Sequence, residues 1–274
     1  MLLKTITVLS AVLAIALAAA FRIPWLLFSF GAFWLLGAML ALGWLWLICS
    51  KVDMSQEQTE DDPFYRKWMY IYIEVLIQLL QVRVKPIGLE KTPKDTRFLL
   101  VCNHQFVADP GILHHFFRKS QLAFISKKEN DGLFAIGPLM HKTLCQSIDR
   151  EDDRQALQVI LKCIRILKAD QASICVFPEG GTNHDDKLHP FRPGVFKIAQ
   201  KAGVPIVVCT LRNTRPIIQN GIRLKPTDVE LRLLDVIPPE NLKGRTAVDI
   251  SHEVFRMMAA DLGPEMVAAR ETEE

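Results

Sequence analysis

The sequence predicts an α/β fold with a central mixed, largely parallel sheet flanked by helices and preceded by an N-terminal membrane-anchoring helical hairpin. From about residue 82 onward, short apolar runs of strand length alternate with helical patterns, an order that places helices on both faces of a sheet. Polar residues directly follow several of these runs, as they do at the carboxyl ends of buried strands. The hairpin is indicated by the first fifty residues, whose only charged side chains are Lys4 and Arg22.

These first residues form two apolar runs, residues 5–21 and 23–50. A helix needs about 20 residues to cross a hydrocarbon core of about 30 Å, so the second run is long enough and the first is marginal. The N-terminus also has features of a cleaved signal peptide. A secreted product would, however, keep the long uncharged second run. We therefore expect residues 1–50 to be a retained transmembrane or membrane-embedded hairpin.

Residues 51–84 are expected to be a connector followed by an amphipathic interfacial helix. The connector is polar, and from Phe64 onward apolar residues recur at helical spacing beside Arg66 and Lys67. Such a helix can lie along a bilayer, but the same apolar stripe could cover the sheet, and the spacing does not decide between the two. All five Trp and all three Tyr lie within the first 72 residues, which favours aromatic anchors at the level of the lipid headgroups.

Composition limits the class of protein and its partners. Half of the residues are hydrophobic and mean hydropathy is positive, which is high for a soluble domain. The net charge is only +3 and the basic residues are dispersed, so no nucleic-acid partner is expected. The six cysteines include no Cys-x-x-Cys pair, and most lie in apolar runs. They indicate core thiols in a reducing compartment.

The remaining residues, 85–274, are expected to form the catalytic domain. The clearest helix follows Arg150 and ends at Lys168, with one apolar face made of Leu157, Ile160, Leu161, Ile164 and Leu167. Other helices are predicted at 110–117, 132–140, 193–203 and from Ser251. Strands are predicted at 82–84, 98–102, 122–126, 144–148, 172–177 and 204–208, with an edge strand at 230–236.

His104 and Asp109 are the first candidates for chemistry. The apolar strand 98–102 ends at Asn103, so His104 lies on the loop at its carboxyl end, where open α/β sheets place their reactive groups. An imidazole with a carboxylate five positions later can form a general base and the group that orients it. Asp109 followed by Pro110 also has the pattern of a helix N-cap. The alternative is therefore a simple cap and an ordinary loop histidine.

Other chemistries find little support. The chain has no Gly-x-Ser-x-Gly elbow, no phosphate loop ending in Gly-Lys-Ser/Thr and no His-Glu-x-x-His motif. His114 and His115 are adjacent and cannot share one helix face. His184 and His189 lie in a polar loop that we interpret as a solvated turn. We expect no metal site.

The order of the polar segments resembles the glycerophospholipid acyltransferase family, whose best-known members are the 1-acylglycerol-3-phosphate (lysophosphatidic acid) acyltransferases. The resemblance covers about residues 85 to 215 and rests on four motifs, His104 to Asp109, Ile148-Asp149-Arg150, Phe177-Pro178-Glu179-Gly180 and Val204-Pro205-Ile206. The third motif departs from the family pattern. Gly181 intervenes before Thr182, and Asn183 stands where the family has an arginine.

The resemblance implies transfer of a fatty acyl group from a thioester, acyl-CoA or acyl carrier protein, to the sn-2 hydroxyl of lysophosphatidic acid. His104 would be the general base and Asp109 its orienter, with no metal or other cofactor. The second and third motifs would bind the glycerol phosphate, which assigns substrate binding to Arg150, Glu179, Gly180, Gly181 and Thr182, and Lys127 matches a basic position of the family. Arg192 is the nearest downstream arginine and could replace the missing arginine, or it could pair with a surface acid.

Two alternatives for the function remain open at this stage. One is an acyltransferase whose acceptor is another lysophospholipid or glycerol 3-phosphate. The other is a membrane-anchored lipid-binding protein without turnover. For localisation we expect the cell inner membrane with the catalytic domain facing the cytoplasm, because Lys4 precedes the hairpin and Lys51 follows it.

Overall fold

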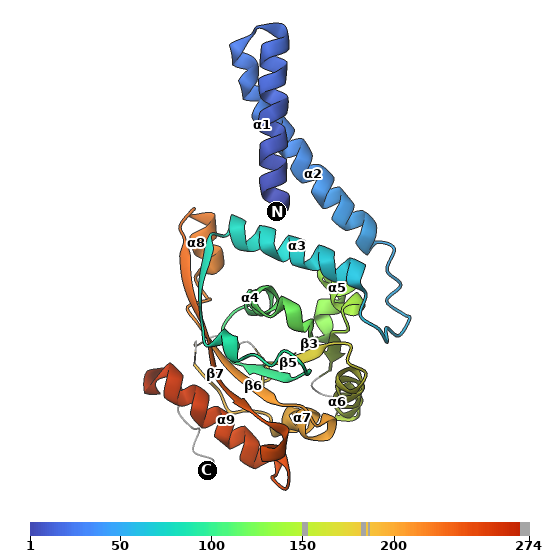
Figure 1. Ribbon diagram of the computed structural model, residues 1–274, viewed down its shortest axis with the longest axis vertical. Helices are drawn as coiled ribbons and strands as arrows, with labels where there is room; N and C mark the ends of the chain where they lie inside the picture. Colours follow the sequence, from blue (N-terminus) through green and yellow to red (C-terminus); the bar gives the residue numbers. More distant parts are fainter. Residues whose placement is uncertain (150–152, 182–184, 186, 269–274) are drawn as a thin grey trace.

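A computed structural model describes residues 1–149, 153–181, 185 and 187–268 (Figure 1). In this part of the chain a seven-stranded sheet has the order β1-β7-β6-β2-β5-β3-β4. All neighbouring strands are parallel except β6 and β7, so the predicted mixed, largely parallel sheet is confirmed. The strands are β1 (Val82–Ile87), β2 (Leu99–Cys102), β3 (Leu122–Lys127), β4 (Gln146–Ile148), β5 (Ser173–Val176), β6 (Ile206–Arg212) and β7 (Thr227–Ile237).

Strand β2 lies at the centre of the sheet, between β5 and β6, and its side chains are fully buried on both faces. Leu99 and Val101 join the hydrophobic core on one face, while Leu100 and Cys102 join a second core on the other. A strand covered on both faces has no polar alternation. This is why its sequence is one continuous apolar run.

Strand β7 corrects the sequence prediction, which placed an edge strand at residues 230–236. It pairs with β6 on one side and with β1 on the other. Buried and exposed side chains alternate along β7 because one face of the sheet is covered more fully than the other. This alternation does not show whether another strand is hydrogen-bonded to β7 on each side. The two edges of the described sheet are β1 and β4.

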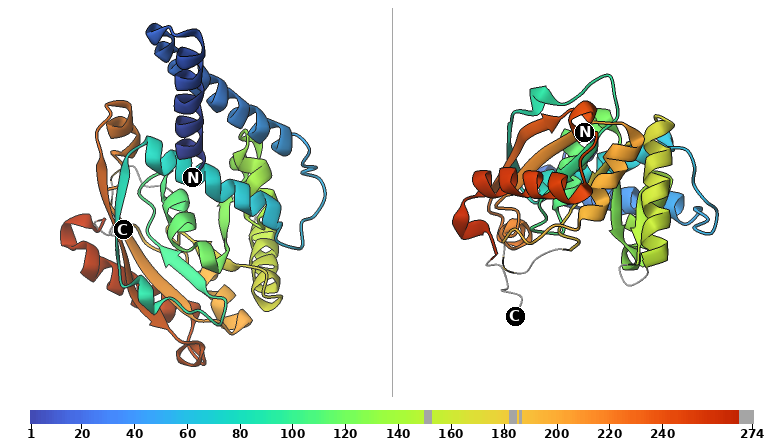
Figure 2. Two further views of the ribbon diagram at one scale, coloured as in Figure 1. Left: turned by 45° about the horizontal axis from the view of Figure 1, so that its top comes forward. Right: turned by 90° about the horizontal axis from the view of Figure 1, so that it is seen from below.

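Helices cover both faces of the sheet (Figures 1 and 2). The helix predicted at 132–140 begins only at Ile136, as α5, and a 3₁₀ turn at Lys128–Gly132 precedes it. Residues 193–203 form a 3₁₀ turn followed by α7, which Gly203 caps with φ 73°. The C-terminal helix starts before Ser251, at a capping box between Thr246 and Asp249. The helices are α4 (Asp109–Phe116), α5 (Ile136–Lys142), α6 (Asp153–Lys168), α7 (Lys197–Ala202), α8 (Ile217–Ile222) and α9 (Ala247–Leu262).

The predicted apolar face of α6 is partly wrong. Leu157 and Leu161 are 55% and 44% exposed, whereas Val159 and Cys163 are buried against the sheet. The helix carries more apolar residues than one face needs. For this reason the periodicity of the apolar residues predicted a face that is rotated around the helix axis from the face that contacts the sheet.

The predicted N-terminal hairpin is confirmed. Helices α1 (Leu2–Phe21) and α2 (Ser29–Cys49) are joined by a 3₁₀ turn at Pro24–Phe28 and project away from the α/β domain, as Figure 1 shows. By length and apolar composition, Leu2–Phe21 and Pro24–Cys49 are each long enough to cross a membrane.

Helix α3 (Pro63–Leu79) lies between the hairpin and the α/β domain and packs against α4 and α5 (Figures 1 and 2). Asp62 caps its N-terminus. Arg66, which the sequence places beside exposed Lys67, is only 3% exposed. It forms an ion pair with Asp61 at 2.6 Å, and its guanidinium also donates to the carbonyl oxygens of Leu122 and Thr143. Arg66 therefore joins α3 to the sheet.

Candidate active site

The candidate site is formed by the loops that leave β2 and β5. These strands are parallel neighbours, so their carboxyl ends lie side by side. Asn103, the first residue after β2, accepts a hydrogen bond from the amide of Leu211 (2.8 Å) and donates one to its carbonyl (2.9 Å). This double contact fixes the start of the loop against β6, and His104 is the next residue.

His104 and Asp109 are in direct contact. Nδ1 of His104 lies 2.8 Å from Oδ2 of Asp109, and that oxygen also accepts hydrogen bonds from the amides of Gln105 and Phe106. Asp109 is completely buried. The carboxylate therefore orients the ring with Nδ1–H as donor and leaves Nε2 with the lone pair that a general base needs.

The structure corrects the predicted helix cap at this position. The N-cap of α4 is Ala108, and Asp109 is already the first residue of the helix. Its carboxylate points back to the amides of the preceding loop instead of forward to the amides of the first helical turn. Asp109 thus stabilises the loop that carries His104.

The third motif is in contact with the first. The ring of Phe177 stacks on the imidazole of His104, with centroids 4.1 Å apart and planes inclined by 15°. The carboxylate of Glu179 accepts one hydrogen bond from the amide of His104 and one from the amide of His189, each 2.9 Å long. Glu179 therefore joins the loop that carries His104 to the loop after β5 by backbone hydrogen bonds. Arg150 of the second motif lies outside the described residues.

Burial raises the pKa of Glu179 from 4.5 to about 7, although the hydrogen bonds from His189 and His104 act in the opposite direction. A carboxyl group with a raised pKa in the folded state binds its proton more tightly there than in the unfolded chain. Protonation of Glu179 therefore raises the free energy of unfolding. This stabilisation is complete below pH 4.5 and is lost as the pH rises to about 7.

This shift predicts a pH-dependent stability. Between pH 5 and 7.5 the free energy of unfolding of the wild type should fall by up to about 3 kcal/mol relative to that of Glu179→Gln, which does not titrate. Denaturant unfolding of both proteins at the two pH values measures the difference. Parallel pH profiles would show that Glu179 has an ordinary pKa.

Gly180 and Arg192 are in contact. Gly180 has φ +80°, and a Cβ at this position would lie 2.6 Å from Nε of Arg192. The amide of Arg192 donates to the carbonyl of Pro178. Only glycine fits this turn without strain. Among the described residues no acidic side chain pairs with the guanidinium of Arg192, so the alternative of a surface ion pair finds no support there.

The other predicted site residues are placed less fully. Gly181 follows Gly180 in the same turn, whereas Thr182 and Arg150 lie outside the described residues. Lys127 is exposed at the end of β3, on the carboxyl edge of the sheet, and has no described contact with His104 or Glu179.

Sequence reasoning missed the roles of Asn103, Phe177 and His189. Asn103 could have been recognised because an amide directly after a buried strand often satisfies neighbouring backbone groups. The stacking of Phe177 and the backbone contact of His189 depend on tertiary structure, and we find no local signal for either.

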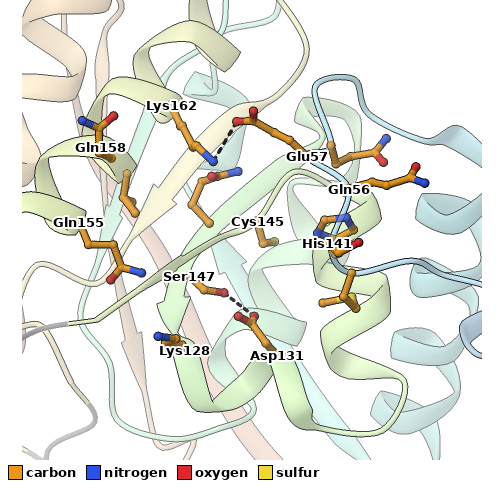
Figure 3. Close-up of a pocket in the computed structure, with 15 residues that line it drawn as sticks. Gln56, Glu57, Lys128, Asp131, His141, Cys145, Ser147, Gln155, Gln158 and Lys162 are labelled. Carbon is orange, nitrogen blue, oxygen red and sulfur yellow. Dashed lines mark hydrogen bonds and ion pairs between the residues drawn. The ribbon is translucent and has the colours of Figure 1, made fainter. Parts of the chain in front are cut away.

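A polar pocket of about 400 Å³ lies beside β4, between the connector and α6 (Figure 3). It is lined by glutamines and charged groups, among them the Glu57–Lys162 ion pair and Asp131, which accepts a hydrogen bond from Ser147. None of the described residues predicted for catalysis or substrate binding lines it. The pocket is therefore separate from the site around His104.

Residues 83–212, which contain β2 to β6, β1 except for Val82, and every predicted site residue, match the model of the acyltransferase family. The chain belongs to the acyltransferase family. It is 33% identical over 190 residues to a 1-acyl-sn-glycerol-3-phosphate acyltransferase of Chlamydomonas reinhardtii, and the match covers 68% of this chain and 55% of that protein. A chloroplastic enzyme of the same name from Brassica napus is 36% identical over 135 residues, covering 49% of this chain and 38% of its own length. The chain thus spans about half or less of these relatives.

The fold of this acyltransferase family member is shared with a solved structure. The crystal structure of the 1-acyl-sn-glycerophosphate acyltransferase PlsC from Thermotoga maritima superimposes with a TM-score of 0.61. The superposition covers 80% of this chain and 86% of the other, at 23% sequence identity. The family resemblance and the fold predicted from the sequence are both confirmed.

Proposed function

We propose that this chain is a membrane-bound O-acyltransferase that transfers a fatty acyl group from a thioester to the sn-2 hydroxyl of 1-acylglycerol 3-phosphate, which gives phosphatidic acid. The observation that carries the proposal is the His104–Asp109 pair, 2.8 Å apart at the carboxyl edge of a sheet in a segment that matches the acyltransferase family. The two relatives described above are named 1-acyl-sn-glycerol-3-phosphate acyltransferases, which supports the choice of 1-acylglycerol 3-phosphate as the acceptor.

The proposed reaction is a direct transfer. The acceptor oxygen attacks the thioester carbonyl carbon, so that a C–O bond forms and the C–S bond breaks. Nε2 of His104 takes the hydroxyl proton and returns it to the leaving sulfur, while Asp109 stabilises the imidazolium through Nδ1. The thiol is released from acyl-CoA or acyl carrier protein, and no enzyme ester, metal or other cofactor takes part.

Arg192 is proposed to bind the acceptor phosphate. Its guanidinium lies against Gly180 of the third motif and has no described acidic partner. A charge-assisted hydrogen bond contributes about 1.5 to 3 kcal/mol, so Arg192→Ala should raise the KM for lysophosphatidic acid by about 10- to 150-fold and change the KM for the thioester little. Arg256→Ala, at an exposed arginine of α9, is the matched control. Unchanged KM values for both substrates would show that Arg192 does not bind the acceptor phosphate.

An acceptor panel tests the proposed function as a whole. Purified protein in mixed micelles receives one labelled acyl thioester and, in turn, lysophosphatidic acid, glycerol 3-phosphate, a zwitterionic lysophospholipid and monoacylglycerol. We expect the highest kcat/KM for lysophosphatidic acid. A higher value for another acceptor would reassign the substrate, and no transfer to any of them would support a lipid-binding protein.

The proposed location is the cell inner membrane, with the hairpin α1–α2 in the bilayer and the α/β domain in the cytoplasm, where thioester donors are made. The two apolar helices and the lysines on either side of them, Lys4 and Lys51, support this topology. In intact cells a thiol introduced at Glu57 should be protected from a membrane-impermeant reagent. Labelling from outside would show that the α/β domain lies on the opposite side of the membrane.

A further inference from the structure

The loop between β3 and α5 exposes a cluster of large apolar side chains. Leu133, Phe134 and Ile136 are 46%, 61% and 49% exposed, whereas Ala135 between them is buried. Scattered exposed apolar residues are normal on protein surfaces. Three of them within four residues, one of them aromatic, form a patch that requires an explanation.

The backbone of this loop fixes the orientation of these side chains. Ala135 has φ 59° and ψ −36°, and the amide of Ile136 donates to the carbonyl of Phe134 at 2.7 Å. These values describe a γ-turn of the rare positive-φ type, which is strained for any residue with a Cβ. A Cβ at Gly137 would lie 2.1 Å from the carbonyl oxygen of Asp131, so the next residue must be glycine. The loop is therefore held in a costly conformation that keeps its apolar side chains outward.

The loop lies at the end of the hairpin. Ala135 and Leu139 pack in one cluster with Leu45, Ile48 and Cys49, the last turn of α2, and Sγ of Cys49 is 4.0 Å from the carbonyl oxygen of Ala135. The rings of Trp44 and Trp68 are 5.5 Å apart near the same end of α2. Tryptophans at the end of an apolar helix mark the level of the lipid headgroups. The exposed loop reaches that level.

Exposed basic residues precede the loop. Lys127 and Lys128 follow one another at the end of β3, on the edge of the sheet that carries the candidate site. Glu129 and Asp131 lie between these lysines and residues 133–136, so the segment has no net charge. The contact with the bilayer surface is therefore assigned to the apolar side chains and not to an excess of basic residues.

We propose that residues 133–136 insert into the headgroup region and form a bilayer contact separate from the hairpin. This contact holds the carboxyl edge of the sheet at the lipid surface, so that a lysolipid reaches His104 directly from the membrane. The inference rests on the proposed placement of α1 and α2 in the bilayer.

Lipid-borne quenchers test the contact itself, without a need for activity. All six native cysteines are buried, so a thiol introduced as Phe134→Cys can be labelled selectively with an environment-sensitive fluorophore, with labelled wild type as the background. Leu42→Cys on the exposed side of α2 reports on the hairpin, and Val248→Cys on α9 is the matched exposed control. The full chain is reconstituted in phosphatidylcholine–phosphatidylglycerol vesicles that contain nitroxide lipids.

We expect quenching at positions 134 and 42 and none at 248. At 134, a nitroxide near the headgroup should quench more strongly than one at the end of the acyl chain. Quenching at 42 but not at 134 overturns the loop contact alone. Absence of quenching at both overturns the membrane placement of α2 and the loop contact with it.

A kinetic comparison tests the role of the contact in substrate access. Phe134→Asp should lower kcat/KM for lysophosphatidic acid presented in vesicles by roughly tenfold or more, because a buried phenylalanine contributes on the order of that factor. The rate with a short-chain monomeric acceptor should stay the same. Val248→Asp controls for the added charge, and thermal unfolding reports on folding. An equal loss with both forms of acceptor, or no loss with either, contradicts the proposed role.

Discussion

His104→Ala is expected to reduce acyl transfer by about 10²- to 10⁴-fold, the contribution of a positioned general base. The substitution removes the nitrogen that accepts the hydroxyl proton and leaves Asp109 with its two amide donors, Gln105 and Phe106. The loop should therefore keep its fold. Initial rates with saturating thioester and lysophosphatidic acid measure the effect.

His252→Ala provides the control, because His252 is exposed on α9. It should retain the wild-type rate, and both variants should show the wild-type thermal unfolding transition. Retention of more than about a tenth of the rate by His104→Ala would exclude the general-base role, given the 10²-fold minimum.

The largest expected effect on stability belongs to Arg66→Ala. The side chains of Arg66 and Asp61 are 4% and 6% exposed, and the guanidinium also serves two buried carbonyl groups. Removing one partner of a buried ion pair costs about 3 to 5 kcal/mol, because the other charge stays buried without compensation. Denaturant unfolding in detergent should show this loss, while Lys67→Ala, the exposed neighbour on α3, should change stability by no more than about 0.5 kcal/mol.

A double variant separates the ion pair from simple packing. Arg66→Met with Asp61→Leu removes both charges and keeps apolar volume, so it should be more stable than Arg66→Ala. If the double variant is as unstable as the single one, the hydrogen bonds to Leu122 and Thr143 carry the stabilisation instead.

The parts of the fold that were predicted correctly depend on local signals. Strand β2 is a continuous apolar run, the hairpin is nearly free of charge, and the spacing of His104 and Asp109 spans one loop and the start of one helix. The sequence therefore indicated that His104 and Asp109 come together at the carboxyl edge of the sheet. It also indicated that Arg192 would lie beside the third motif, because both belong to one short segment of the chain.

The errors arise from contacts between distant segments. β7 is an internal strand because it pairs with β1, whose residues lie about 145 positions earlier in the sequence than their partners. The residues of β7 themselves do not indicate this neighbour. The burial of Arg66 was not predicted, because its partners at Leu122 and Thr143 are remote in sequence. The cap predicted at Asp109 failed because the loop amides of Gln105 and Phe106 compete with the amides of the helix for the same carboxylate.

The central claim, direct transfer with His104 as base, is tested most directly by release of free thiol after rapid mixing of the purified protein with acyl-CoA. Without acceptor we predict no thiol burst, and with lysophosphatidic acid we predict one thiol released for each phosphatidic acid formed. A burst that equals the enzyme concentration in the absence of acceptor would reveal an acyl-enzyme and contradict the account.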